Sequence, residues 1–211
     1  MTGVTSIRRT QASRRATSHT LILDAAVDLL VERGYSGTTT VAIQERAGVT
    51  RGRLLHHFPS RTALLVAAAQ HLAENRITEM AEWFERTADP DPGAATRIDQ
   101  AITMLWSTFR QPYFWAAMEL WTAARTDTHL RDELAASEQR LGRAIRHVIA
   151  TMFGPVHSSH PAFEDMRELL FTSMRGVAIT YSISDRDPDT DSHLDMWTAT
   201  SHRMLRVDPA D

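Results

Sequence analysis

The chain has 211 residues, of which 43% are hydrophobic, and it contains no cysteine. It is long enough to bury a sizeable core, whereas disulfides, thiolate metal sites and cysteine nucleophiles are excluded. No apolar run approaches the roughly 20 residues that a membrane-spanning helix needs. The polar, arginine-rich stretch 1–20 also lacks the apolar segment of a secretory signal. We therefore expect a cytoplasmic protein without membrane contact.

The net charge of −3 hides an uneven distribution along the chain. Residues 1–65 carry nine Arg and four acidic residues, a net charge of +5, whereas the rest carries 14 Arg and 22 acidic residues, a net charge of −8. A basic end on an acidic body indicates that only the first part meets a polyanion such as DNA. The alternative, on charge alone, is a solvated basic tail.

Four helices are predicted in the first part of the chain. Residues 1–17 have no core pattern and are expected to form a disordered basic arm, which either lies along a DNA groove or has no role. Residues 18–60 are expected to form a three-helix domain that meets DNA, and 61–211 a second, larger helical domain. The predicted helices run from Ser18 to Gly34, from the threonine run 38–40 to Gly48, from Thr50 to Phe58-Pro59, and from the cap Ser60 to about Thr87, the last one connecting the two domains.

Five more helices are predicted after a break at 88–93, where Asp91 is expected to be a cap and Pro92 to occupy the first turn. The segment from Gly154 to Pro161 is expected to be a loop. Because no period-two strand pattern is found, the predicted fold class is all-α with about nine helices. The later helices carry the apolar stripe 98–109, follow Pro112, extend from the cap Asp127 to about Met152, cover 161–184 and cover about 190–206.

The most informative segment is 43–58, where two short helices are joined by a tight turn. Gly48 stands where a residue with positive φ is needed. Ile43, Ala47, Val49 and Leu54 are spaced to pack the two helices against each other at an angle. The second helix is then expected to expose Thr50, Arg51, Gly52, Arg53, His56 and His57.

This exposed face suits the major groove because it offers a hydroxyl and two guanidinium groups and no carboxylate. Arg51 and Arg53 can each fork onto guanine O6 and N7 or onto phosphate, and the glycine between them lets the backbone approach DNA. Thr39 and Thr40 begin the preceding helix, so hydroxyls and free amides there can bind a phosphate. Arg61 is expected to grip a flanking phosphate. The alternative is a bihelical turn whose surface arginines are merely structural.

These segments resemble the DNA-binding domain of the TetR family, the tetracycline-repressor-like helix-turn-helix regulators. Two positions depart from the family pattern: Leu55 stands where a phosphate-contacting Tyr is usual, and Gln44 where Ala is common. Leu55 removes one expected contact, so more of the phosphate binding is assigned to His56, His57 and Arg61. The resemblance spans about 45 residues, in the segments 22–35 (ILDAAVDLLVERGY), 38–40 (TTT), 47–52 (AGVTRG), 57–61 (HFPSR) and 64–65 (LL).

The resemblance implies a homodimer built on a four-helix bundle from the last two helices of each subunit. Two recognition helices would then enter successive major grooves of a palindromic operator, roughly 34–36 Å apart. The helix 161–184, apolar on nearly every side, favours a dimer independently because a monomer would leave one of its faces wet. The predicted dimer surface, some of which must instead be core, comprises Leu169, Leu170, Met174, Val177, Tyr181, Leu194 and Trp197.

The resemblance also implies that the middle helices, at about 95–181, enclose a ligand cavity. Clustered aromatic side chains and Met can line an adaptable apolar pocket, or they can be ordinary core. Glu119, near this cluster, is expected either to pair with an arginine or to anchor a ligand, and we favour the pair. The predicted effector-pocket residues are Trp106, Phe109, Phe114, Met118, Trp121 and Met174.

The predicted function is therefore a ligand-responsive DNA-binding regulator, by default a repressor released by a small, largely apolar or aromatic effector. The alternative is a non-specific or structural DNA-associated protein with no effector. An enzyme is not expected, because the sequence has no Gly-rich phosphate loop or nucleophile elbow. The pair His157-x-x-His160 lies in a Ser/Pro loop without nearby acidic ligands, so neither a metal nor another cofactor is predicted.

Overall fold

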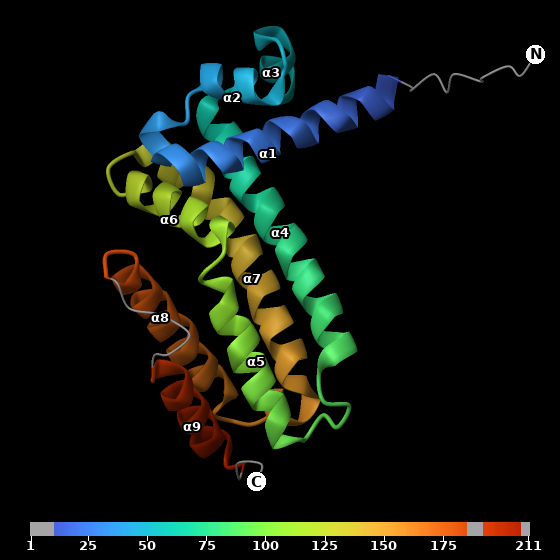
Figure 1. The fold of residues 1–211 in the computed structure, drawn as a ribbon, viewed down its shortest axis with the longest axis vertical. Helices are drawn as coiled ribbons and strands as arrows, with labels where there is room; N and C mark the ends of the chain where they lie inside the picture. Colours follow the sequence, from blue (N-terminus) through green and yellow to red (C-terminus); the bar gives the residue numbers. More distant parts are fainter. Residues whose placement is uncertain (1–10, 185–191, 208–211) are drawn as a thin grey trace, which may run out of the picture. The chain divides into compact units, whose positions relative to one another are not determined.

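The computed structural model describes residues 11–184 and 192–207, and all the regular structure in these ranges is α-helical (Figure 1). The predicted all-α fold with about nine helices is confirmed. The helices are α1 (Gln11–Gly37), α2 (Thr40–Ala47), α3 (Arg51–His57), α4 (Arg61–Thr87), α5 (Ala95–Thr108), α6 (Pro112–Ala124), α7 (Thr128–Ser158), α8 (Phe163–Tyr181) and α9 (His193–Leu205).

The first helix begins earlier than the sequence predicts. α1 starts at Gln11 instead of Ser18, so the backbone of 11–17, assigned to the basic arm, is helical. The remainder of the predicted arm, 1–10, lies outside the described residues.

The chain divides into two compact units whose boundaries differ from the predicted boundary after residue 60. Among the described residues, 11–72 and 116–137 form the first unit, and 73–115 together with 138–184 and 192–207 form the second. Three helices, α4, α6 and α7, therefore contribute residues to both units.

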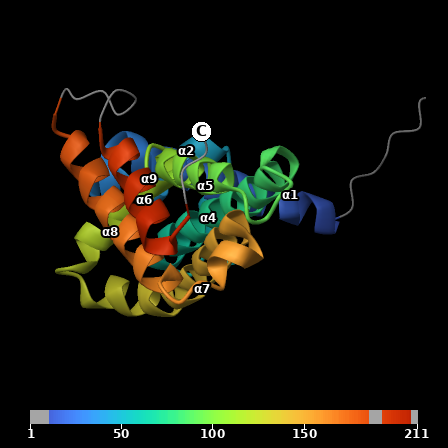
Figure 2. The ribbon, with the colours of Figure 1, turned by 90° about the horizontal axis from the view of Figure 1, so that it is seen from below.

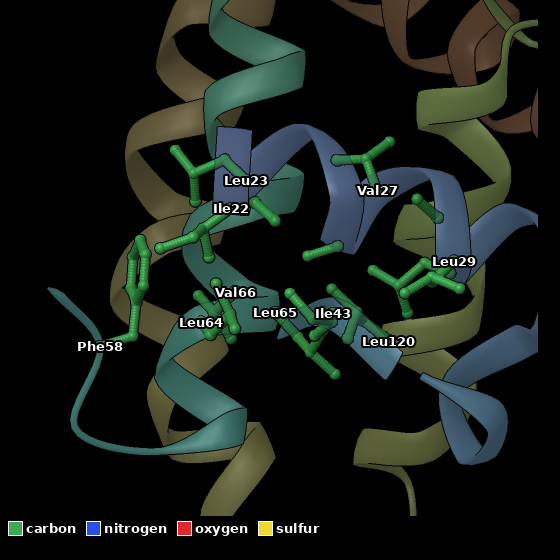
Figure 3. Close-up of a cluster of buried hydrophobic side chains, with 14 of the residues drawn as sticks. Ile22, Leu23, Val27, Leu29, Ile43, Phe58, Leu64, Leu65, Val66 and Leu120 are labelled. Carbon is green, nitrogen blue, oxygen red and sulfur yellow. The ribbon is translucent and has the colours of Figure 1, made fainter. Parts of the chain in front are cut away.

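The core of the first unit is built by the amphipathic faces of α1 to α4 together with residues that come much later in the chain. Ile22, Ile43 and Leu65 are buried in one hydrophobic cluster together with Leu120 of α6 (Figure 3). Leu54 of α3 belongs to the same cluster. Ala116, Ala124, Leu130 and Leu134 complete it from α6 and α7. Burying one such leucine stabilises the fold by about 1.5–3 kcal/mol, so α6 and α7 help to hold the first three helices together.

Caps and turns in the first unit follow local chemistry. The Ser60 hydroxyl accepts a hydrogen bond from the Ala63 amide at 3.0 Å, which confirms its predicted role at the start of α4. Asp127 caps α7 in the same way, its carboxylate accepting from the Leu130 amide at 3.0 Å. Gly48 has φ 64°, in the left-handed region that the turn prediction required.

In the second unit, α9 lies against both α5 and α8 (Figure 2). The predicted apolar stripe of α5 is its inner face, with Ile98, Ile102, Leu105 and Trp106 buried. Buried His202 of α9 contacts the carboxylate of Asp99 on α5, with 2.6 Å between Nε2 and Oδ1. Apolar burial and this polar contact together fix the pairing of α9 with α5.

Two sequence predictions in this unit are wrong. The residue that caps α5 is Ala94, which offers no side-chain hydrogen bond, whereas Asp91 accepts from the Gly93 amide at 2.9 Å within the preceding turn. Gly154 does not begin a loop: it is a kink with φ 80° inside α7, which continues to Ser158.

The turn before α5 is organised by Asp89. Its carboxylate accepts hydrogen bonds from the Thr96 hydroxyl at 2.6 Å and from the Asp91 amide at 3.0 Å. These bonds, the Thr96 bond first, hold the pKa of Asp89 below its usual value. The turn is thus stabilised by the ionised form of Asp89.

Candidate functional site

Two buried residues, one on α2 and one on α3, orient α3 so that its opposite face is exposed. Ile43 of α2 and Leu54 of α3 are buried in the core of the first unit, so the opposite side of α3 faces outward. A Cβ added at Gly52 would meet nothing within 4 Å, so packing within the chain does not require glycine there. Of the residues predicted to face DNA from this helix, Thr50, Arg51, Gly52, Arg53 and His56 are exposed and His57 is half-buried.

The guanidinium groups of Arg51 and Arg53 are available for a ligand. Within the described ranges neither side chain takes part in an ion pair or hydrogen bond. Arg46 of α2 differs, because it binds both carboxylate oxygens of Glu32, at 2.9 and 2.6 Å, and lowers the pKa of Glu32 by this contact. The basic charge of this unit is therefore neutralised within the fold at Arg46 but not on α3.

Threonine hydroxyls cap both short helices. Thr39 accepts from the Ala42 amide at 3.2 Å, and Thr50 accepts from the Arg53 amide at 3.3 Å. Each hydroxyl proton is left to donate elsewhere, and the helix N-terminus beside it carries partial positive charge. Thr39 and Thr50 are exposed and Thr40 is half-buried. The hydroxyls and the free amides at these helix starts can therefore donate hydrogen bonds to phosphate oxygens.

Arg61 has partners inside the first unit. Its Nε donates to the carbonyl oxygen of Thr38 at 2.7 Å, its Nη2 donates to the carbonyl oxygen of Tyr35, and the guanidinium lies over the Tyr35 ring, 4.2 Å from the centroid. The sequence analysis assigned Arg61 to a flanking phosphate, and that role stays a prediction. What the sequence did not indicate is that Arg61 fixes the turn between α1 and α2.

Two further residues of the first unit have roles that the sequence did not predict. The ring of His19 on α1 lies 5.6 Å from that of His57 and 5.0 Å from that of Phe58, which places a third histidine next to α3. Glu119 of α6 accepts a hydrogen bond from the Tyr35 amide at 2.7 Å. The favoured Glu119–arginine pair is therefore wrong, because the partner is a backbone amide.

The geometry of this unit agrees with the comparisons to known proteins. A family model described as bacterial regulatory proteins, tetR family, matches residues 22–68. The HTH-type transcriptional regulator CymR of Pseudomonas putida is 30% identical over 172 residues, which cover 82% of this chain and 83% of that protein. The chain belongs to the TetR family. It is a helix-turn-helix transcriptional regulator.

Solved structures share the TetR-family fold over nearly the whole chain. A transcriptional regulator from Rhodococcus sp. Rha1 is similar with a TM-score of 0.67 and 21% identity, over 91% of this chain and 100% of that one. FadR from Bacillus subtilis, solved in complex with stearoyl-CoA, is similar with a TM-score of 0.60 and 18% identity, over 89% of this chain and 96% of that one.

In this TetR-family protein, the predicted effector-pocket residues fall into two groups. Trp106, Phe109, Phe114 and Met174 are buried in the second unit. Met118 and Trp121 belong to the first unit, where Trp121 packs half-buried against the core. The proposed pocket role of Trp121 thus has a competing structural explanation.

The second unit contains a continuous aromatic cluster. Phe109 contacts Phe114 at 5.2 Å and Phe171 at 5.4 Å between ring centroids, and Trp106 contacts Trp197 at 4.9 Å. The members of this aromatic cluster are Trp106, Phe109, Phe114, Trp115, Phe171, Tyr181, His193 and Trp197.

Polar groups border the aromatic cluster. The Tyr181 hydroxyl lies 3.2 Å from Nδ1 of His193. The guanidinium of Arg175 lies 4.8 Å from the centroid of the Phe171 ring, and burial lowers its pKa. Burial raises the pKa of Tyr113 to about 12.

The predicted dimer surface contains both core and exposed residues. Leu170, Met174 and Trp197 are buried within the chain, so they belong to the core. Val177, Tyr181 and Leu194 are half-buried, and Leu169 is 44% exposed. Exposed residues that the sequence analysis did not select are Gly176, Ile179, Ile183 and Met196.

Metal and membrane sites are not found in the part of the chain that the structure describes. His157 is buried, with its Nε2 3.1 Å from the carbonyl oxygen of Ala94, and Nδ1 of His160 accepts from the Ala162 amide at 3.1 Å. Across 11–184 and 192–207, no group of three or more His, Cys, Asp or Glu side chains could hold a metal ion. No helix in these ranges is long and apolar enough to cross a membrane.

Proposed function

We propose that this TetR-family regulator is a repressor that binds a palindromic operator as a homodimer and is released by a small, largely apolar or aromatic effector. The observation that carries the proposal is the exposed face of α3, where Arg51 and Arg53 have no partner within the described residues. Guanidinium groups on a helix of this kind read guanine O6 and N7 in the major groove. The threonine-capped start of α2 would bind a backbone phosphate and fix the register.

A homodimer is supported by the outer face of α8. Leu169, Thr172, Gly176 and Ile179 are exposed and are spaced three or four residues apart, so they share one side of the helix. A Cβ added at Gly176 would meet nothing within 4 Å, which leaves room for the close approach of a second helix. Exposed Met196 on α9 adds to the same type of surface. An apolar surface of this kind fits a second copy of the chain.

The effector class is argued from the aromatic cluster of the second unit. Ring stacking and the soft side chain of Met174 favour flat or apolar molecules. Among the similar structures, FadR was solved with stearoyl-CoA and the multidrug binding protein EbrR with malachite green, both of which carry large apolar or aromatic parts. Binding that favours a different spacing of the two recognition helices would weaken operator binding by linkage, typically by about 1–3 kcal/mol.

The proposal is tested by fluorescence anisotropy of the purified protein on DNA from immediately upstream of its own gene. A scrambled duplex at about 150 mM salt is the comparison, because non-specific binding is strongly salt-dependent. A preference of about a thousandfold or more is expected of a specific regulator. Equal, weak binding to the upstream duplex, to the scrambled duplex and to sequences selected from random DNA would instead indicate a non-specific DNA-associated protein. The specific complex can then be used to screen aromatic and acyl compounds for release.

A further inference from the structure

The chain leaves the helical conformation at Gly34, near the end of α1, and the segment from this kink to the start of α2 forms the turn 34–39. This turn is held by two charged side chains that come from distant parts of the chain. Glu119 of α6 accepts from the Tyr35 amide at 2.7 Å, while Arg61 of α4 donates to the carbonyl oxygens of Tyr35 and Thr38. Both backbone polar groups of Tyr35 are therefore bound by side chains from α6 and α4, two of the three helices that contribute residues to both units.

We propose that Glu119 is a positioning residue for DNA recognition: its hydrogen bond to the Tyr35 amide sets the position of α2 and controls operator affinity. This inference rests on the proposed function as an operator-binding regulator. Glu119 itself makes no contact with DNA in this account, and it acts through the turn 34–39.

The fit of the carboxylate into the turn is specific. Gly34 has φ 66°, and a Cβ added there would lie 2.8 Å from Oε2 and 3.3 Å from Cδ of Glu119. The carboxylate thus occupies the space that a side chain at position 34 would need. The glycine and the carboxylate therefore form one complementary contact.

The turn fixed in this way leads directly into the start of α2. The Thr38 hydroxyl donates to the Gly34 carbonyl oxygen at 2.8 Å, and the next residue, Thr39, caps α2. The N-terminus of α2 is the proposed phosphate site. Release of the Tyr35 amide would loosen this turn and with it the orientation of the phosphate-binding amides.

Three substitutions separate the hydrogen bond from the charge. Glu119→Gln keeps the length and an acceptor oxygen but removes the charge, whereas Glu119→Asp keeps the charge but shortens the side chain by one methylene. Glu119→Ala removes both, and Thr122→Ala, at an exposed position of the same helix, is the control. For each full-length variant we would measure operator affinity across salt concentrations, the melting temperature, and hydrogen exchange of the Tyr35 amide.

The Ala and Asp variants should bind the operator about tenfold more weakly, which corresponds to the net loss of about one hydrogen bond. Because the amides and the hydroxyl at the start of α2 are neutral, the salt dependence of binding should change little, whereas Tyr35 exchange should quicken at least tenfold. The Gln variant should stay within about twofold of the parent protein. The Asp variant, a mild change, keeps the test valid if the Ala variant does not fold.

Two results would overturn the proposal. One is unchanged Tyr35 exchange in the Asp and Ala variants, which can be measured without DNA. The other is the reverse pattern, with the Gln variant weakened and the Asp variant normal, which would assign the effect to charge. Failure of the proposed function looks different, since the parent protein would then show no preference for any operator while Tyr35 exchange still followed Glu119.

Discussion

The contribution of α6 to the DNA-binding unit leads to a quantitative prediction for Leu120→Ala. Leu120 is 0% exposed and packs in the cluster that also contains Leu29 and Ile43. The substitution removes three carbon atoms, about 2.4 kcal/mol at 0.8 kcal/mol per buried methylene, and the cavity left behind adds to this loss. We expect the free energy of unfolding to fall by about 3–4 kcal/mol.

The matched control is Leu21→Ala on α1, because Leu21 is 47% exposed and leaves no enclosed cavity. Its expected cost is about 1 kcal/mol or less. Both variants would be compared with the parent protein by equilibrium urea unfolding followed by far-ultraviolet circular dichroism. If Leu120→Ala is no more destabilising than Leu21→Ala, Leu120 does not belong to the core of the first unit, and the assignment of 116–137 to that unit is wrong.

Three more substitutions address DNA reading, assembly and the response to acid. Arg53→Ala should cost about 1–3 kcal/mol at one base position and relax specificity there; anisotropy on a set of single-base operator variants measures this, and a uniform loss on all of them would make Arg53 a phosphate contact. Ile179→Asp should shift the protein toward monomer in sedimentation, whereas Val156→Asp, at an exposed position of α7, should not; a dimer that survives the first change argues against the α8 surface. Because the folded-state pKa of Asp89 is lowered, its carboxylate stabilises the fold above the usual carboxyl pKa, and this contribution is lost as pH falls through the lowered value. In Asp89→Asn the free energy of unfolding should therefore fall less steeply as the pH is lowered, measured by urea unfolding at a series of acidic pH values. An equal change in Asp132→Asn on α7 would show that the effect is not local to the Asp89 turn.

Features that depend on neighbouring residues could be predicted from the sequence. Ser60 and Asp127 are helix caps because a short polar side chain reaches an amide three residues on. Gly48 required a positive φ because the two helices meet at an angle within a few residues. The exposure of Arg53 follows from helical period, once Leu54 is placed inward.

Features that depend on distant residues could not be predicted. Helical period shows that Leu120 is buried but not which partners cover it, and its partners are up to about a hundred residues away. Glu119 and Arg61 bind backbone groups, which leave no residue-type signal in the sequence. In α8, apolar residues lie on the exposed side as well as on the buried side, so helical period alone does not separate buried Met174 from exposed Leu169.

The central claim is that two copies of α3 read a two-fold symmetric DNA site. The most direct measurement is selection of bound sequences from random duplex DNA by the purified full-length protein, followed by sequencing. The account predicts an enriched inverted repeat whose half-site centres lie one helical turn apart or a multiple of it, about 34–36 Å per turn, and loss of one preferred base in each half-site with Arg53→Ala. Enrichment of no sequence, or of a single unrepeated site, would contradict it.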